Sequence, residues 1–327
     1  MHGAILLATA LIIRNVTVID GTGAPPRPRA TVAIVNGRIA ARAPARARAI
    51  DGRGKYLIPG LWDMHAHLRD AKSAADYIAY GITAVRDMGS AGNRPASLRV
   101  FTSGPAIEGP GPEVQFPVIR VATGEDGFNA VERLDSQQVD FVKVLSSVPR
   151  DAYFAVAQRC RLLRLPFAGH VPNSVTVAEA INARQRSIEH IASIPPDTPP
   201  EVLRQMQIYG VRVVPTLAIE PHVADRLQMI RAAGIDILAG SGTADPAALH
   251  RELELLVHAG FTPLQAVRAA TYAAAEFMGV ADRVGSIRRG MDADLVLLGA
   301  NPLADIRNTR RISAVIVRGV LTRPPKL

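Results

Sequence analysis

Four histidines and one lysine stand within or directly after short apolar segments, where polar side chains are uncommon. His65 and His67 are two positions apart, so a β-strand would present both imidazoles on one face. Lys143, His170 and His190 belong to three later apolar segments. A single buried histidine is usually a satisfied core residue, and a single buried lysine can be neutral or ion-paired. Five such residues together favour a metal site, because imidazole is a common ligand of divalent ions.

Eight apolar segments that alternate with helical patterns would position these side chains. The predicted strands are 61–68, 82–87, 99–103, 140–145, 166–170, 187–191, 212–217 and 236–239, and the predicted helices include 150–164, 176–183, 200–209, 221–233, 249–259 and 263–278. Eight parallel strand–helix units form a TIM (β/α)8 barrel, whose active site lies at the carboxyl ends of the strands. Asp63 and Glu189 flank the candidate ligands and should point to the opposite strand face, which predicts structural roles for both.

Both ends of the chain have β character instead. Short apolar runs fill residues 12–58, with Asn36-Gly37 as a hairpin signal, and similar runs return at 294–298 and 314–317. We therefore predict an α/β protein in which a TIM barrel is joined to a small β-sandwich domain built from both chain ends. The expected boundaries are 1–58 and 284–327 for the β-sandwich domain and 59–283 for the barrel.

Composition excludes several other classes of protein. The 327 residues carry a net charge of +9, but only four of the 38 Lys and Arg residues are lysines, and the arginines are scattered. No zinc-finger or helix-turn-helix spacing accompanies them, so no nucleic-acid partner is expected. The single cysteine, Cys160, excludes an internal disulfide.

The first residues decide the predicted location of the protein. Residues 4–13 are apolar but too short to span a bilayer, and no other segment is long enough, so no membrane span is expected. The segment is either the remnant of an export signal or the start of a strand. We favour the strand and a cytoplasmic protein, with export as the alternative, and the sequence gives no indication of oligomeric state.

The segments that carry the candidate ligands resemble the amidohydrolase superfamily. The matching motifs are Pro59-Gly60-Leu61-Trp62-Asp63-Met64-His65-Ala66-His67, Phe141-Val142-Lys143-Val144, Phe167-Ala168-Gly169-His170-Val171-Pro172 and Arg186-Ser187-Ile188-Glu189-His190. The resemblance extends over nearly the whole chain. It is greatest to the imidazolonepropionase-like, Xaa-Pro dipeptidase-related branch.

This resemblance implies a binuclear metal centre. His65 and His67 would hold one divalent ion, His170 and His190 the other, and Lys143 would bridge the two as a carbamate. A carbamate converts the lysine from a cation into an anionic oxygen ligand, which suits two adjacent cations. Zinc is the expected metal, although histidine and carbamate also suit manganese or iron. The implied activity is hydrolysis of an amide, dipeptide-like or cyclic amide bond in a small molecule or peptide-like substrate by a metal-activated hydroxide.

One position departs from the family pattern. The family has an aspartate after strand eight, in a Gly-Thr-Asp or Gly-Ser-Asp triplet, which acts as general acid and base. Here the triplet is Gly240-Ser241-Gly242, and the nearest carboxylate is Asp245. We name Asp245 as the candidate catalytic residue, with Glu220 or His222 as a substitute. The remaining alternative is a metal-binding protein with no general base, whose activity is degenerate or altered to a lyase or isomerase type.

Overall fold

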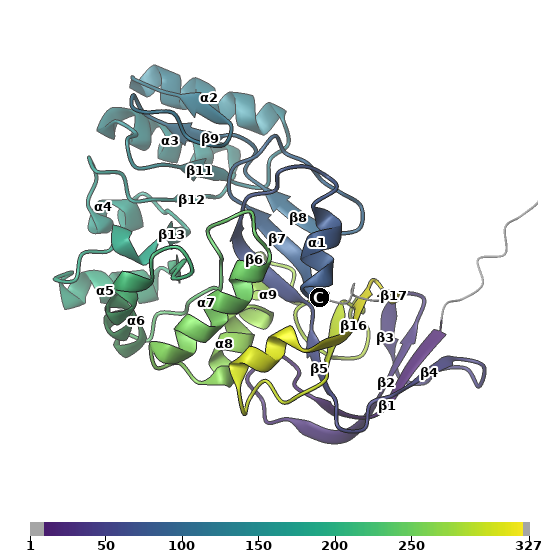
Figure 1. The fold of residues 1–327 in the computed structure, drawn as a ribbon. Helices are drawn as coiled ribbons and strands as arrows, with labels where there is room; N and C mark the ends of the chain where they lie inside the picture. Colours follow the sequence, from purple (N-terminus) through teal and green to yellow (C-terminus); the bar gives the residue numbers. More distant parts are fainter. Residues whose placement is uncertain (1–9, 323–327) are drawn as a thin grey trace, which may run out of the picture. The chain divides into compact units, whose positions relative to one another are not determined.

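The computed structural model describes residues 10–322 (Figure 1). The chain divides into two compact units: a first unit of residues 1–62, 75–83 and 262–327, and a second unit of residues 63–74 and 84–261. The domain boundaries predicted from the sequence, at 58/59 and 283/284, differ from the limits of these two units. These boundaries stay a prediction. The possible export-signal remnant falls largely on residues 1–9, outside the described residues, and the first strand begins at Ala10.

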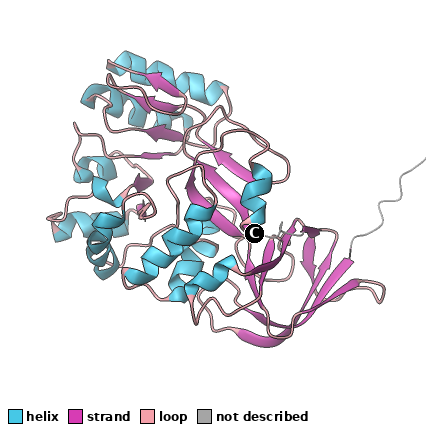
Figure 2. Cartoon of the chain, viewed as in Figure 1, coloured by secondary structure: helices cyan, strands magenta, loops and turns pink. Residues whose placement is uncertain are grey.

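The first unit contains an eight-stranded sheet to which both ends of the described chain contribute (Figure 2). β5 pairs antiparallel with β15, with Tyr56 opposite Leu298, so the predicted association of the two ends is present. Hydrogen bonds join all eight strands into one sheet in the order β17-β16-β15-β5-β1-β2-β3, with β4 beside β1. The strands are β1 Ala10–Val18, β2 Arg27–Val35, β3 Arg38–Ala40, β4 Arg48–Asp51, β5 Tyr56–Pro59, β15 Leu295–Leu298, β16 Ile312–Val317 and β17 Val320–Thr322.

The helix predicted over 263–278 is two helices, α8 Pro263–Ala269 and α9 Tyr272–Phe277. The break occurs at Thr271, whose backbone (φ −140°, ψ −94°) is not helical. α8 begins with a capping box between Thr262 and Gln265 and with Pro263 in its first turn, a pattern typical of a helix start. α1 Ala74–Ala79, which the sequence analysis did not predict, and the 3-10 helix η3 Ile306–Arg310 complete the helices of this part of the chain.

The second unit is built mainly from parallel strands. β6 Leu61–Ala66, β7 Ile82–Asp87 and β8 Arg99–Thr102 form one sheet, and β6 and β7 begin in the first unit. The other sheet has the order β10-β9-β11-β12-β13-β14 and is paired parallel. Its strands are β9 Ala106–Glu108, β10 Val118–Arg120, β11 Val142–Val144, β12 Phe167–Gly169, β13 Ser187–Glu189 and β14 Arg212–Val214.

This architecture is an α/β fold of the TIM-barrel type, and it departs from eight uninterrupted strands. Seven of the eight predicted segments form strands. The eighth, 236–239, forms no regular strand. This stretch makes a parallel bridge to β14 through Ile237, and Thr243 just beyond it makes another to β6. Two short strands, β9 and β10, were not predicted from the sequence.

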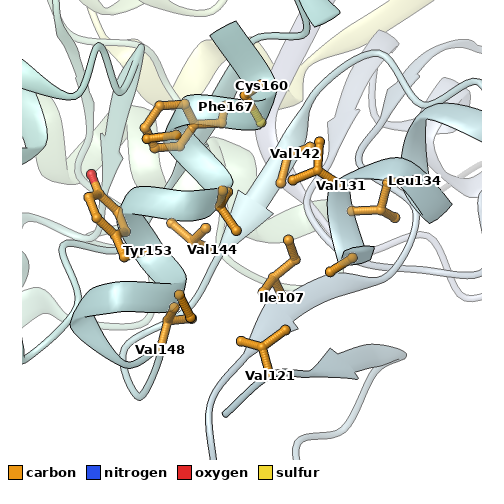
Figure 3. Packing of buried hydrophobic residues seen from close by; sticks show 14 of the residues in the cluster. Ile107, Val121, Val131, Leu134, Val142, Val144, Val148, Tyr153, Cys160 and Phe167 are labelled. Atoms are coloured by element: carbon orange, nitrogen blue, oxygen red, sulfur yellow. The ribbon is translucent and has the colours of Figure 1, made fainter. Parts of the chain in front are cut away.

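Helices α2 Gly124–Ser136 and α3 Arg150–Leu163 cover β9 and β11 and bury a hydrophobic core of the second unit (Figure 3). A capping box between Thr123 and Asp126 starts α2, and Arg164 ends α3 in a left-handed conformation. The two helices approach closely at Gly127, where a Cβ would lie 2.6 Å from the Ala152 carbonyl oxygen. This packing fixes β11, the strand that carries Lys143.

The remaining helices follow the later strands. They are α4 Val177–Asn182, η1 Ile191–Ser193, α5 Pro200–Ile208, η2 Pro221–Arg226, α6 Leu227–Ala232 and α7 Ala247–His258. The helix predicted over 221–233 is thus a 3-10 segment followed by a short α-helix, because Val223 leaves the helical region. Within residues 10–322, no helix combines the length and the apolar character needed to cross a membrane.

Candidate metal centre

The structure brings the five predicted ligands together at the carboxyl ends of β6, β11, β12 and β13, all within the second unit. The imidazole centroids of His65 and His67 are 5.4 Å apart, those of His65 and His190 are 4.8 Å apart, and those of His170 and His190 are 4.7 Å apart. The Nζ atom of Lys143 is 3.3 Å from Nε2 of His65. The histidines therefore form a continuous row, with Lys143 beside it.

Every histidine of this row is held at its Nδ1 atom. The partners are Glu189 Oε2 for His65 at 2.9 Å, the Gly89 carbonyl for His67 at 3.1 Å, Ser146 Oγ for His170 at 2.6 Å and Thr216 Oγ1 for His190 at 2.8 Å. A carboxylate and a carbonyl only accept, so His65 and His67 donate from Nδ1. The Thr216 hydroxyl donates to the Pro215 carbonyl and therefore accepts from His190. Nε2 then carries the lone pair, which is the usual arrangement of a metal-binding histidine.

Burial keeps the four imidazoles neutral. Loss of solvent lowers the pKa of His67 and of His190 to about 3, and Lys143 adds to both shifts. The pKa values of His65 and His170 are also well below the usual value, with burial as the main cause. Neutral imidazole is the form that binds metal ions, so the row is ready to bind without losing protons.

Lys143 is the one lysine buried in the described part of the chain, and its environment favours the neutral amine. Burial lowers its pKa to about 7, against the opposing effect of Glu189. Its Nζ donates to the Met88 carbonyl at 2.6 Å and lies 5.0 Å from the centre of the Phe116 ring. A buried lysine near its pKa has a reactive, nucleophilic amine, as carbamate formation requires.

A buried ion pair between Arg86 and Glu189 contacts the histidine row at His65. Arg86 donates to Glu189 Oε1 at 2.6 Å, while Oε2 of the same carboxylate contacts His65. Arg86 also donates to the Met64 carbonyl at 2.7 Å and to Ser187 Oγ at 2.9 Å. Glu189 was expected to be purely structural, and its contact with His65 was not predicted. The signal available in the sequence was Arg86 itself, a charged residue in an otherwise mostly apolar strand.

The four histidines could hold divalent ions as two pairs, with two imidazoles for each ion. Among the described residues, no three His, Cys, Asp or Glu side chains surround a common point at which they could hold an ion. An ion held by only two histidines would therefore need further ligands, and Lys143 is the side chain placed to contribute one. The Nε2 atoms, freed by the anchoring of Nδ1, are the observation that supports this fit.

The position that was matched to the family aspartate from the sequence is a glycine, Gly242. Gly242 has φ +73°, and its N–H donates to the His65 carbonyl at 2.8 Å. A Cβ there would lie 2.7 Å from Cδ1 of Ile219 and 3.2 Å from Cβ of Thr216, the residue that holds His190. Gly242 thus lies beside the histidine row, and the side chain of Ile219 closes the space next to it.

Asp245 is not brought to the row. Its side chain is exposed, and Oδ1 accepts the Ala247 N–H at 2.9 Å at the start of α7. His222 is also exposed. The side chain of the predicted catalytic residue therefore belongs to the turn that precedes α7, since the chain enters this helix directly after the bridge at Thr243.

A cavity of about 950 Å³ adjoins the row and has His170 and His190 in its wall. Glu220 also lines it, unlike Asp245 and His222. The Oε2 atom of Glu220 is buried without a hydrogen-bond partner, and burial raises the pKa of this carboxyl group. Of the carboxylates considered from the sequence, Glu220 is the one that faces the space where a substrate would bind.

The fold and this site are those of an amidohydrolase. The family model described as the amidohydrolase family matches residues 56–322, and the chain belongs to this family. The resemblance predicted from the motifs is thereby confirmed. Membership makes the chain a hydrolase of carbon–nitrogen bonds, including amide bonds, and the family generally uses divalent metal ions.

Individual relatives show how far the similarity extends. An ochratoxinase of Aspergillus niger is 25% identical over 360 residues, which cover 80% of this chain and 74% of the relative. A solved Xaa-Pro dipeptidase with bound methionine superposes with a TM-score of 0.83 at 21% identity, covering 96% of this chain and all of that one. The solved A. niger ochratoxinase superposes with a TM-score of 0.79 at 21% identity, covering 98% of this chain and 97% of that one. The two structural matches establish the fold.

Proposed function

We propose that this protein is a metal-dependent amide hydrolase whose two divalent ions, of which zinc is the expected metal, are held by His65 and His67 and by His170 and His190. Lys143, as a carbamate, is the bridging ligand. The observation that carries the proposal is the orientation of the row: each imidazole is anchored at Nδ1, which leaves Nε2 for a metal. The lowered pKa of Lys143 supports the carbamate, because only the neutral amine can form it.

When bound, divalent ions supply Lewis acidity toward an amide carbonyl and lower the pKa of water. The chain's own residues provide the remaining parts of the reaction. Glu189 keeps His65 in one orientation, Arg86 balances the charge of Glu189, and the adjoining cavity binds the substrate. Hydrolysis also needs a group that moves a proton to the leaving nitrogen.

We assign this proton transfer to Glu220 in place of the family aspartate. Glu220 lines the same cavity as His170 and His190 and has a buried oxygen without a partner. Its raised pKa favours a carboxyl group that can both take and return a proton. Asp245, by contrast, is exposed and accepts a backbone hydrogen bond of α7.

Metal analysis tests the first part of this proposal. Protein produced with zinc and bicarbonate should contain about two equivalents of tightly bound metal, as expected for a binuclear site. Lys143→Ala should lose most of it, and Lys72→Ala, a change of an exposed lysine, is the matched control. Less than one equivalent in the parent protein would contradict the binuclear centre.

Kinetics of two carboxylate variants test the second part. With a panel of N-acyl amino acid amides and dipeptides, Glu220→Gln should lower kcat by about 10²- to 10⁴-fold, the usual effect of losing a general acid–base group. Asp245→Asn should retain parent activity. The reverse pattern would assign the role to Asp245. If a metal-loaded parent hydrolyses nothing in the panel, the alternative of degenerate or altered activity, favoured by the glycine at position 242, is correct.

A further inference from the structure

The cavity beside the histidine row is mostly apolar. Beyond His170 and His190, its wall includes Val171, Pro172, Val175, Pro195, Pro199 and Val202. A cavity of about 950 Å³ is large enough for a substrate group well beyond a single amino acid side chain. Burial of apolar groups would therefore supply most of the binding free energy in this region.

The ionisable residues of the wall, apart from its histidines, are both acidic. They are Asp197, which is exposed, and Glu220, which is partly buried. Among the described residues that line the cavity, none is an arginine or a lysine. Away from the histidine row, a ligand carboxylate placed here would meet two carboxyl groups and no basic side chain.

Two arginines contact the segments that form the wall, and both have other partners. Arg226 donates to the carbonyls of Ala192 at 3.1 Å and Ile194 at 3.3 Å. Arg150 is paired with Glu179 and donates to the Ser174 carbonyl at 3.1 Å. Turning either guanidinium toward a ligand would require breaking these contacts.

Backbone N–H groups do not replace the missing cation. The segment that leads into α5 is Pro199-Pro200, and neither residue has an N–H to donate. Two of the donors that follow are used, because the N–H groups of Val202 and Leu203 both bond to the Pro199 carbonyl. This entrance to the helix therefore offers an anion few of the donors that such positions usually provide.

We propose that the part of the substrate that fills this cavity is apolar and ends in a neutral or positively charged group, and not in a free carboxylate. Transfer of an ionised carboxylate from water to this mostly apolar wall is not compensated by any lysine or arginine side chain. The inference rests on the proposed amide hydrolysis, because it describes the substrate of the same site. It favours peptide-like or other amides with a blocked or basic end over dipeptides whose free carboxylate would enter the cavity.

Binding of three matched ligands tests the inference directly. 4-Phenylbutylamine, 4-phenylbutanamide and 4-phenylbutanoate share one apolar body and differ in the charge of one end. Calorimetry with the metal-loaded full chain at pH 7.5 should give affinities for the amine and the amide that exceed that for the carboxylate by about tenfold. A carboxylate affinity equal to or higher than that of the amide would overturn the inference.

A charge-reversal variant locates the effect in this cavity. Asp197→Lys should raise the carboxylate-to-amide affinity ratio by about three- to tenfold, since it replaces repulsion by attraction. Asp135→Asn removes an exposed carboxylate on α2, away from the cavity wall, and should leave the ratio unchanged. Any direct contact of the ligand carboxylate with a bound metal ion affects this affinity ratio equally in the parent and in the variant. The difference between the two proteins therefore reports only the change at residue 197. An unchanged ratio in Asp197→Lys would overturn the assignment.

Hydrolysis separates this inference from the proposed function. If the amine and amide bind best but no amide substrate is cleaved, the charge preference stands and the proposed hydrolase fails. If N-acyl amino acids with free carboxylates are cleaved faster than their carboxamide counterparts, the hydrolase stands and the charge preference fails.

Discussion

The two sides of the candidate site are built differently. On one side, His65, Lys143, His170 and His190 lie in or directly after regular strands, and each imidazole has a defined partner. On the other side, the segment 236–243 makes isolated bridges instead of a strand. The side with the candidate metal ligands is regular, while the side with Gly242 is irregular. Under the proposed function, metal binding and proton transfer would therefore depend on separate parts of the fold.

One strained backbone position lies on the irregular side. Thr216 has φ +54°, which is unusual for a β-branched residue, and it follows β14 directly. Glu252 on α7 holds this loop, since its Oε2 accepts the Ala218 N–H at 2.8 Å. Burial, with a smaller effect from Asp63, raises the pKa of Glu252 well above its usual value. A buried acid thus fixes the loop that orients His190 and places Ile219.

The largest expected effect comes from the buried ion pair on the regular side. Arg86→Met leaves Glu189 charged and without its partner in a fully buried position. Such a break costs about 3–5 kcal/mol of unfolding free energy. Chemical denaturation of the parent and the variant measures it.

Arg150→Met is the matched control for this prediction. It breaks an arginine–glutamate pair of the same chemistry on the exposed surface, where solvent screens the charges. Little change in stability is expected. Equal losses in Arg86→Met and Arg150→Met would show that the pair beneath the row contributes no more than a surface pair.

A pH dependence of stability is the next largest effect. In metal-free protein the folded pKa of Lys143 is about 7 and the ordinary value is 10.5. Between these values the unfolded chain binds a proton that the folded chain does not. The free energy of unfolding therefore rises with pH in this window, by at most about 1.4 kcal/mol per pH unit, and the contribution levels off below pH 7. Lys143→Met should lack this rise, and identical slopes in the two proteins would refute the buried neutral amine.

Restoring the family aspartate should have a smaller, unfavourable effect on stability. Gly242→Asp places a side chain at φ +73°, with its Cβ 2.7 Å from Ile219. Strain of this kind costs about 1–3 kcal/mol. Adding Ile219→Ala should recover part of the loss, because it removes the contact but not the backbone strain. A double variant no more stable than Gly242→Asp would show that Ile219 does not fill this space.

The same contrast explains how much of the fold the sequence could predict. Apolar segments with fixed periodicity gave seven of the eight barrel strands and the pairing of the two chain ends, because burial imposes both patterns. The eighth segment, 236–239, makes only an isolated bridge, and it is followed directly by Gly240 and by Gly242, which has positive φ. The break between α8 and α9 depends on one residue, Thr271, in an otherwise continuous helical pattern.

The site shows a similar limit. Residue types and spacing pointed to the four histidines of the row and to Lys143 beside it, since each of these polar side chains stood out in an apolar segment. The partners that anchor them could not be found this way, because Ser146 and Thr216 are ordinary loop residues whose role depends on three-dimensional proximity. Glu189 was assigned to the opposite strand face by strand alternation. In the structure its carboxylate, on β13, contacts Nδ1 of His65 on β6. Asp245 was named on sequence proximity to Gly242, which says nothing about the direction of the chain at α7.

The smallest effect is expected at Asp245. Asp245→Ala removes the oxygen that accepts the Ala247 N–H in the turn before α7, a loss worth about 0.5–1.5 kcal/mol. Asp245→Asn keeps a side-chain oxygen at that place, so its melting temperature should be close to that of the parent. Thermal unfolding of both variants beside their hydrolysis rates distinguishes the two roles of this residue. A stable Asp245→Asn protein without activity would return Asp245 to the catalytic site, whereas a small loss of stability with full activity in Asp245→Ala confirms a structural role in the turn before α7.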